Sequence, residues 1–171
     1  MSQKLREIEN KIFELDAFLA LRENLSDAHK KVVFTNGCFD ILHLGHVTYL
    51  AQAAELGDFL VVAVNDDASV RAQNKAHNRP INTESARAFL IAALSFVDVV
   101  VIFSEDTPLT LIQEIKPDVL VKGSDYDADE NDPNSKKYIV GSAQIKANGG
   151  AVITIDLVPN YSTTGILKKG V

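Results

Sequence analysis

Two histidines three residues apart carry the most specific chemical signal in this chain. His43 and His46 follow the apolar run Val32–Asn36, which breaks into a turn at Gly37. Residues three apart in the first turn of a helix project toward the same side, and the free N–H groups of a helix start suit phosphate. Gly45 between them leaves room for a ligand to approach the backbone. This corner predicts a nucleotide-binding active site.

Apolar runs alternate with helical patterns along the rest of the chain, which is typical of a parallel sheet with crossover helices. We predict an α/β fold, a Rossmann-like doubly wound parallel sheet with an extra N-terminal helix. The five expected strands are short and rich in β-branched residues, as buried parallel strands are. They are Val32–Asn36, Phe59–Asn65, Val97–Phe103, Val119–Lys122 and Ala151–Asp156.

Helix ends are marked by glycine, proline and capping residues. The expected helices are Lys4–Asn24, His46–Leu56 before Gly57, one capped by Thr107 with Pro108 at its first position, and Lys137–Asn148 before Gly149. The polar stretches Gln73–Asn82 and Gly123–Lys136 lack periodicity and are expected to be surface loops. We therefore expect a helix over 1–26 and one domain over 27–171.

The composition and net charge of the chain indicate which kinds of molecule it binds. The chain has 171 residues, 46% of them hydrophobic, and a net charge of −6. That balance argues against a nucleic-acid or membrane surface, because phosphate-rich polymers are bound mainly by clustered Lys and Arg. The single cysteine, Cys38, has no partner for an internal disulfide, and no signal peptide is evident. We expect a cytoplasmic protein that binds a small anion.

In an open parallel sheet, ligands bind beyond the carboxyl ends of the strands. Asn65 and Lys122 each end an expected strand, and a lone cation such as Lys122 after an apolar run is more naturally a ligand contact than a core residue. Ser162, Thr163 and Thr164 combine hydroxyl groups with the N–H groups of an expected helix start, although Ser162 alone can serve as the helix cap.

The segment Asn36-Gly37-Cys38-Phe39-Asp40 followed by His43-Leu44-Gly45-His46 resembles the signature of the cytidylyltransferase-like nucleotidyltransferases. Within that superfamily the chain most resembles the D-glycero-β-D-manno-heptose 1-phosphate adenylyltransferases, over roughly Lys31 to Lys169. The segments that carry this resemblance are Phe34–His46, Asn78–Asn82, Val121–Tyr126, Asn148–Gly150 and Ser162–Thr164. Related cytidylyltransferases have an arginine-containing motif where this chain has Pro159-Asn160-Tyr161, which argues against CTP.

The resemblance implies transfer of AMP from ATP, with Mg²⁺, to a sugar 1-phosphate, giving ADP-heptose and pyrophosphate. Because members of this family are commonly oligomeric, we expect a homo-oligomer, and the sequence shows no dedicated set of protein metal ligands. The implied catalytic residues are His43, His46 and Lys122. The implied nucleotide contacts are Asn36, Gly37, Cys38, Phe39, Gly45, Gly123, Asp125, Ser162, Thr163 and Thr164. The implied substrate or loop contacts are Asp40, Asn65, Lys75, Arg79 and Arg87.

Several alternatives stay open on sequence alone. Asp40 can cap the next helix, Arg87 can pair with Glu84 one turn away, and Lys75 can simply be solvated. Cys38 is favoured as a small buried residue over a nucleophile, because no general base is placed beside it. For function, the alternatives are another phosphorylated acceptor (glycerol 3-phosphate, phosphopantetheine or FMN) and a module that binds a nucleotide without catalysis.

Overall fold

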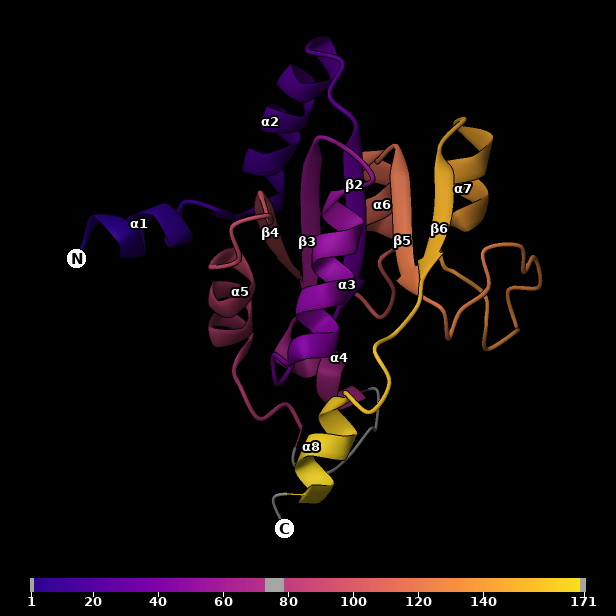
Figure 1. Cartoon of the computed structure of the whole chain (residues 1–171). Helices are drawn as coiled ribbons and strands as arrows, with labels where there is room; N and C mark the ends of the chain where they lie inside the picture. The colour runs from indigo at the N-terminus through magenta and orange to yellow at the C-terminus, as the bar shows by residue number, and fades with distance from the viewer. Residues whose placement is uncertain (1, 73–78, 170–171) are drawn as a thin grey trace.

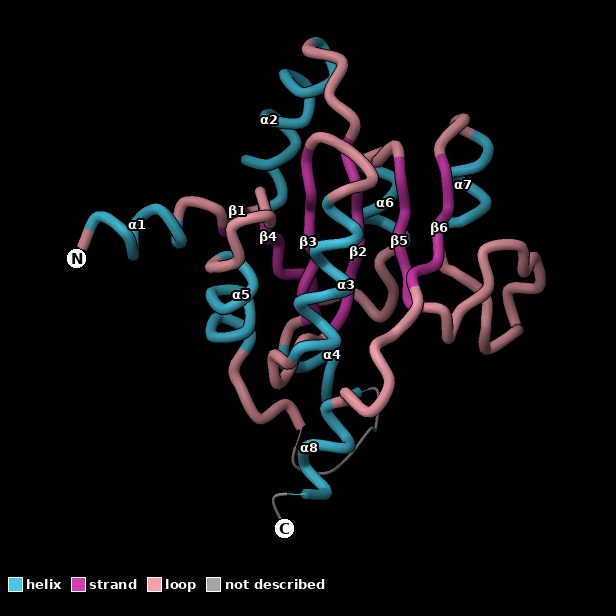
Figure 2. Tube along the Cα trace, in the orientation of Figure 1, coloured by secondary structure: helices cyan, strands magenta, loops and turns pink. Residues whose placement is uncertain are grey.

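The structure, a computed structural model, describes residues 2–72 and 79–169. Within these ranges one parallel sheet is flanked by helices (Figures 1 and 2). Its strands are β1 (Ile12–Phe13), β2 (Val32–Gly37), β3 (Phe59–Asn65), β4 (Val99–Phe103), β5 (Val119–Gly123) and β6 (Ala151–Ile155). The helices are α1 (Gln3–Glu9), α2 (Leu15–Asp27), α3 (Leu44–Ala54), α4 (Asp67–Ala72), α5 (Glu84–Ala92), α6 (Leu109–Ile115), α7 (Ser142–Ala147) and α8 (Thr163–Lys169).

Both faces of the sheet are covered, so alternate residues of each strand enter two separate cores. Val33 packs on the face of α3 and α5, whereas its neighbour Phe34 packs on the face of α2, α6 and α7. Val119 and Leu120 alternate in the same way on β5. Burial on both sides explains why the strand sequences are almost continuously apolar.

The strand order β1-β4-β3-β2-β5-β6 reverses direction at β2. From β2 the chain moves outward through β3 to β4, and it then returns to place β5 on the other side of β2. The carboxyl ends of β2 and β5 therefore flank the switch point of the sheet, where ligands bind in open α/β folds.

The predicted fold class is confirmed, but the sheet has six strands rather than five. The expected single helix over Lys4–Asn24 is wrong, because it is interrupted by β1. Ile12 and Phe13 pair with Val100 and Val101 at the sheet edge. Helical spacing of apolar residues across 4–24 concealed this break, since sheet pairing and burial override a local periodicity.

Several helices and strands begin at residues other than those predicted. Helix α7 covers only the second half of the expected helix Lys137–Asn148, because Gly141 precedes it with φ 89° in the left-handed region. Helix α3 begins two residues early, at Leu44, and α6 begins after Pro108 rather than after Thr107. Helix α4 was not predicted, and β4 begins at Val99, two residues after the predicted start of its strand.

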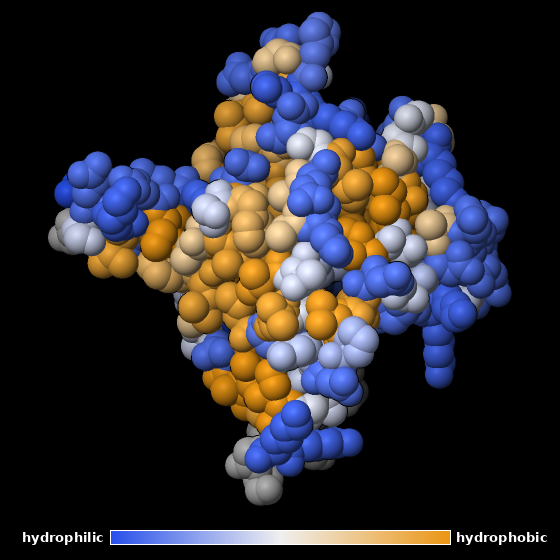
Figure 3. Space-filling view, in the orientation of Figure 1, coloured by the Kyte–Doolittle hydropathy of each residue, from blue (hydrophilic) through white to orange (hydrophobic). Residues whose placement is uncertain are grey.

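Surface character varies over the molecule. In Figure 3 apolar side chains gather over the face of α3 and α5, whereas the loop after β5 is hydrophilic. Exposed Leu44 and Leu90 belong to these two helices. None of the helices described is long and apolar enough to cross a bilayer. The division of the chain at residue 26 stays a prediction.

Candidate active site

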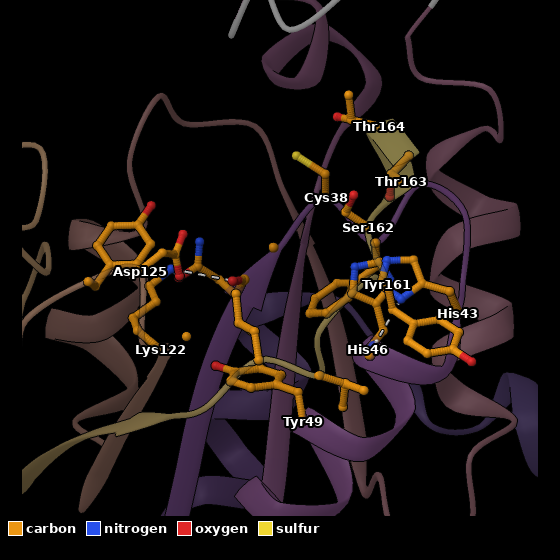
Figure 4. Close-up of a pocket in the computed structure, with 18 of the residues that line it drawn as sticks. Cys38, His43, His46, Tyr49, Lys122, Asp125, Tyr161, Ser162, Thr163 and Thr164 are labelled. Atoms are coloured by element: carbon orange, nitrogen blue, oxygen red, sulfur yellow. Dashed lines mark hydrogen bonds between the residues drawn. The ribbon is translucent and has the colours of Figure 1, made fainter. Parts of the chain in front are cut away.

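A cavity of about 510 Å³ opens at the carboxyl ends of β2 and β5 (Figure 4). Most residues predicted to contact ligand line it. These are Asn36, Gly37, Cys38, Phe39, His43, Gly45, His46, Asn65, Arg79, Lys122, Gly123, Asp125, Ser162, Thr163 and Thr164. Asp40 and Arg87 do not line it, and Lys75 lies outside the described residues. The fold thus brings together residues from five separate segments.

The two histidines form one stacked pair at the start of α3. Their ring centroids are 3.7 Å apart with an interplanar angle of 14°. His43 is the N-cap of the helix, and its Nδ1 accepts a hydrogen bond from the backbone N–H of His46 at 3.3 Å. Because Nδ1 is the acceptor, the neutral His43 ring carries its proton on Nε2. The cap therefore selects one tautomer of this histidine.

Both imidazoles are held toward their neutral form. Burial lowers the pKa of His43, and burial together with the nearby His43 and Arg79 charges lowers the pKa of His46 to about 4. His46 Nδ1 is buried with no hydrogen-bond partner among the described residues. The ring of Phe39 packs edge-on against His46 at 5.2 Å. At neutral pH the pair supplies hydrogen-bonding groups rather than positive charge.

Little room is left for a side chain at two glycines of this corner. A Cβ on Gly45 would lie 3.1 Å from the His43 ring and 3.2 Å from the Cβ of Tyr161. A Cβ on Gly37 would lie 3.1 Å from the ring of Phe39, whose own φ of 47° turns the chain sharply. A side chain at either glycine would require the rings of His43 or Phe39 to shift by a few tenths of an ångström.

Lys122 extends from the end of β5 toward the end of β2. Its Nζ donates to the side-chain oxygen of Asn36 at 2.6 Å and to the Asn36 carbonyl at 3.3 Å. The ammonium also lies 5.5 Å from the centre of the Tyr126 ring. The two strands that flank the switch point are thus joined by a cationic side chain in the cavity.

Asp40 serves the loop beside the cavity rather than the helix that follows it. Its buried carboxylate accepts from the backbone N–H groups of Ile81 and Asn82, at 2.8 and 3.0 Å, and from Arg79 Nε at 3.0 Å. The N-cap of α3 is His43, so the alternative of Asp40 as a helix cap is wrong. Asp40 fixes the chain that carries Arg79 into the cavity wall.

Arg87 lies fully buried beneath the same turn. It donates to the Cys38 carbonyl at 2.7 Å, to the Asn82 carbonyl at 3.0 Å, and to the Asp67 carboxylate at 2.7 Å. The alternative ion pair with Glu84 is wrong, since that carboxylate instead accepts from the backbone N–H of Asp67. Arg87 ties the ends of β2 and β3 to the start of α5 without lining the cavity.

Ser162 caps a helix and also lies in the cavity wall. It lines the cavity, and its Oγ accepts from the backbone N–H of Gly165 at 3.0 Å, which caps α8. Cys38 lies near the Asn65 side-chain oxygen, 3.9 Å from Sγ. Both Cys38 and Asn65 face the cavity from neighbouring strand ends.

Five further lining residues were missed by sequence reasoning: Tyr49, Tyr126, Leu157, Val158 and Tyr161. Tyr49 follows His46 by three residues and so shares its helix face, a signal that was available. Its hydroxyl lies 2.7 Å from the Thr35 hydroxyl, and burial raises its pKa. Tyr126 lies three residues after Gly123, the last residue of β5. No sequence motif marked Leu157, Val158 and Tyr161 as lining residues.

A family model described as Cytidylyltransferase-like matches residues 34–169, which contain the histidine pair, Lys122 and the start of α8. Fold and site together define a nucleotidyltransferase. The chain belongs to the cytidylyltransferase-like family, as predicted.

Curated relatives extend the match. The chain is 55% identical over 157 residues to the Bifunctional protein HldE of Campylobacter concisus, which covers 91% of this chain and 30% of that protein. It is 53% identical over 148 residues to the protein of the same name from Azotobacter vinelandii, covering 85% of this chain and 29% of that protein. The chain therefore spans less than a third of the length of these relatives.

Two solved structures share the fold. The lipopolysaccharide core biosynthesis protein from Thermoplasma volcanium is 32% identical with a TM-score of 0.56, and the match covers 75% of this chain and 97% of that chain. Pantoate-beta-alanine ligase from Francisella tularensis is 18% identical with a TM-score of 0.61, covering 91% and 75%. The second likeness shows the fold alone.

Proposed function

We propose that this chain is an adenylyltransferase that transfers AMP from ATP to D-glycero-β-D-manno-heptose 1-phosphate, giving ADP-heptose and pyrophosphate. The observation that carries the proposal is the stacked pair His43 and His46, facing a cavity that Lys122 enters from the other side of the switch point. This arrangement suits the alignment of two phosphorylated reactants.

The reaction makes one bond and breaks one. An oxygen of the sugar phosphate attacks the α-phosphorus of ATP, and the bond from that phosphorus to the oxygen bridging to the β-phosphate breaks, with the electron pair leaving on pyrophosphate. The nucleophile is already an anion at neutral pH, so no general base is needed. Catalysis then depends on position and on donors aimed at developing charge.

The neutral histidines match that requirement. His43 has its Nδ1 occupied by the backbone N–H of His46, so its Nε2–H is left to donate to a phosphate oxygen. The lowered pKa of His46 keeps the pair from carrying two charges in contact. A preoriented donor of this kind is worth most where negative charge grows during the reaction.

The choice of substrates is supported by sequence likeness. The segments Asn78–Asn82 and Val121–Tyr126 resemble those of heptose 1-phosphate adenylyltransferases. One structural relative at 32% identity is titled a lipopolysaccharide core biosynthesis protein, and a sugar nucleotide is the kind of product such a process consumes. Pro159-Asn160-Tyr161 stands where related cytidylyltransferases have an arginine-containing motif, which supports ATP over CTP.

Mg²⁺ would arrive as MgATP. Among the described residues no three His, Cys, Asp or Glu side chains gather as a metal cluster, so phosphate oxygens and water would supply most ligands. We place the reaction in the cytoplasm, where ATP is available. We also propose a homo-oligomer, supported by exposed Leu5, Leu44 and Leu90; sedimentation at micromolar concentration tests it, and a monomer mass would contradict it.

The proposal is tested by mixing the pure chain with Mg²⁺, ATP or CTP, and a panel of acceptors: heptose 1-phosphate, glycerol 3-phosphate, phosphopantetheine and FMN. We expect ADP-heptose by mass spectrometry, with equimolar pyrophosphate, and slower reaction for every other pair. Product from another acceptor would show that the chain is a nucleotidyltransferase of the same family with a different acceptor substrate. Tight ATP binding with no product from any acceptor would favour a binding module instead.

A further inference from the structure

Tyr49 adds a hydroxyl group to the wall of the cavity. It lies on α3, three residues after His46, and lines the cavity with only 8% of its surface exposed. In Figure 4 its hydroxyl points toward the side of the cavity on which Lys122 and Asp125 lie, away from the histidine pair. A tyrosine hydroxyl at the end of a buried ring is one of the few polar groups that orient a ligand in such a wall.

The direction of the hydrogen bond between Tyr49 and Thr35 follows from burial. Their hydroxyl oxygens are 2.7 Å apart, and either can be the donor. Thr35 has no exposed surface, so if Tyr49 were the donor, the Thr35 proton would be buried with no acceptor among the described residues. If Thr35 donates instead, both hydroxyls are paired once Tyr49 uses its own proton in the cavity. Thr35 therefore orients the Tyr49 O–H toward a ligand.

Tyr49 keeps its proton throughout the neutral pH range. Burial raises the pKa of Tyr49, and the nearby Asp125 and Tyr126 raise it further, whereas the hydrogen bond with Thr35 lowers it. A lowering of this kind is what a hydrogen bond donated to the phenolic oxygen produces. Tyr49 is therefore a neutral donor, and Thr35 acts on its oxygen.

Asp125 supplies an acceptor on the same side of the cavity. Its carboxylate packs over the end of β5, where a Cβ on Gly123 would lie 2.6 Å from one of its oxygens. After burial, the charge of Asp125 is the next cause that raises the pKa of Tyr126, and it also raises the pKa of Tyr49. The Tyr49 hydroxyl and the Asp125 carboxylate therefore lie within electrostatic reach of each other.

A phenol donor near a carboxylate acceptor favours one kind of ligand group. A hydroxyl can accept from the phenol and donate to the carboxylate, whereas an ionised phosphate offers acceptors only and is repelled by Asp125. We propose that Tyr49, oriented by Thr35, is a specificity-determining residue that donates a hydrogen bond to a sugar hydroxyl of a bound substrate. This inference rests on the proposed function, under which that hydroxyl belongs to the sugar of the acceptor or to the ribose of ATP.

Removal of one hydroxyl from the protein and one from the ligand tests the contact. The parent chain and Tyr49→Phe are titrated by calorimetry in Mg²⁺, first with ATP, 2′-deoxy-ATP and 3′-deoxy-ATP, and separately with heptose 1-phosphate and analogues that each lack one hydroxyl. No reaction occurs, because only one substrate is present. We expect Tyr49→Phe to bind the substrate that Tyr49 contacts about 3- to 10-fold more weakly, as for one lost neutral hydrogen bond.

The deoxy analogue that lacks the contacted hydroxyl should behave differently in the two proteins. The parent chain should bind it about 3- to 10-fold more weakly than the full substrate, whereas Tyr49→Phe should bind the two equally, since both changes remove the same interaction. Coupling among the nucleotides assigns the hydroxyl to ribose, and coupling among the sugar phosphates assigns it to the acceptor. If Tyr49→Phe kept the parent's ratio of Kd values for every analogue, the proposal would be overturned.

The controls separate recognition from a structural role. Tyr138→Phe, at a tyrosine that does not line the cavity, is the matched control and should keep the parent's affinity for every ligand. Thr35→Val should lower the ratio of Kd values between analogue and substrate, and Thr35→Ser, which keeps the hydroxyl, should preserve it. A residue that only supports the fold would weaken substrate and analogue alike, so an unchanged ratio in Thr35→Val would overturn the orienting role of Thr35.

The outcomes separate this inference from the proposed function. If ADP-heptose forms and no analogue shows coupling to Tyr49, the hydroxyl subsite is overturned and the function stands. If coupling occurs among the nucleotides but no ADP-heptose forms, the subsite stands and the proposed function fails.

Discussion

The histidine pair and the buried charges Asp40 and Arg87 both contact the turn after β2, but the two groups are built in opposite ways. His43 and His46 are partly exposed, stack on each other, and present nitrogen atoms to a cavity. Asp40 and Arg87 have no exposed surface and are bonded to several backbone groups. Neither of these two charged residues lines the cavity.

The difference indicates that the two groups of residues have separate roles, one toward substrate and one in holding the structure. The histidines are placed where substrate can use them, whereas the buried charges hold the turn, the loop at 79–82 and the start of α5 at fixed positions. Substitutions in the first group should act on turnover and those in the second on stability as well. The predictions below test that division, from the largest expected effect to the smallest.

The largest effect is expected at the histidines. His46→Asn or His43→Asn should each lower kcat by about 10²- to 10³-fold, the loss typical for one preoriented donor, while the chain stays folded. Steady-state pyrophosphate release and circular dichroism measure the two quantities. Full turnover in both variants would remove the histidines from the mechanism.

His43 offers a sharper comparison because it is also a helix cap. Asparagine can replace the capping role of His43, whereas alanine cannot, so His43→Ala should lose about 1 kcal/mol of stability relative to His43→Asn. Both variants should have the same low kcat. His29→Asn, at an exposed histidine with φ 54° that asparagine tolerates, is the control and should match the parent chain.

The next effect is on stability. Arg87→Met leaves the Asp67 carboxylate and two backbone carbonyls without their donor, so the free energy of unfolding should fall by about 3 kcal/mol in urea titrations. Turnover at 15 °C, where the variant is folded, should also fall, because the Cys38 carbonyl is released.

Arg22→Met is the matched control for Arg87. Arg22 also donates to backbone carbonyls, those of Ile115 and Lys116, but it lies on the opposite face of the sheet. We expect it to cost stability and to leave kcat/KM unchanged. If both arginine variants lost activity equally, the special connection between Arg87 and the cavity would be disproved.

The effect that is smallest at neutral pH, where it vanishes, concerns the protonation of His46. The pKa of His46 is lowered from 6.5 to about 4 in the folded protein, so the unfolded chain takes up this proton first as pH falls. Stability should therefore be lost between pH 6.5 and pH 4, by at most about 1.4 kcal/mol per unit, and should be unaffected by this group above pH 7. His46→Asn should unfold with a shallower dependence over that window. An identical slope would mean that His46 is not held neutral.

The parts of the fold that could be predicted are those with a local pattern. Apolar strands at regular spacing gave the parallel sheet, and the arrangement of strand ends gave the place of the cavity. Strand β1 could not be predicted, since Ile12 and Phe13 fit a helical stripe as well as a strand and only pairing with β4 decides between them.

The site divides in the same way. Histidines, lysine and glycines at motif positions were predicted, and the fold brings them to one cavity. The contacts of Asp40 and Arg87 were open alternatives, because each depends on residues about 40 or 50 positions away, at Ile81 and Cys38. The positions of Tyr161 and Leu157 in the cavity wall could not be predicted, because they depend on how the segment before α8 packs against the strand ends.

The central claim is direct attack of a sugar phosphate on ATP held at the histidine pair. Its most direct test uses heptose 1-phosphate carrying ¹⁸O in its phosphate group, followed by mass spectrometry of both products. The account predicts that the label stays entirely in ADP-heptose, including its bridging oxygen, and that pyrophosphate is unlabelled. Label in pyrophosphate, or ADP-heptose that has lost the label, would contradict it.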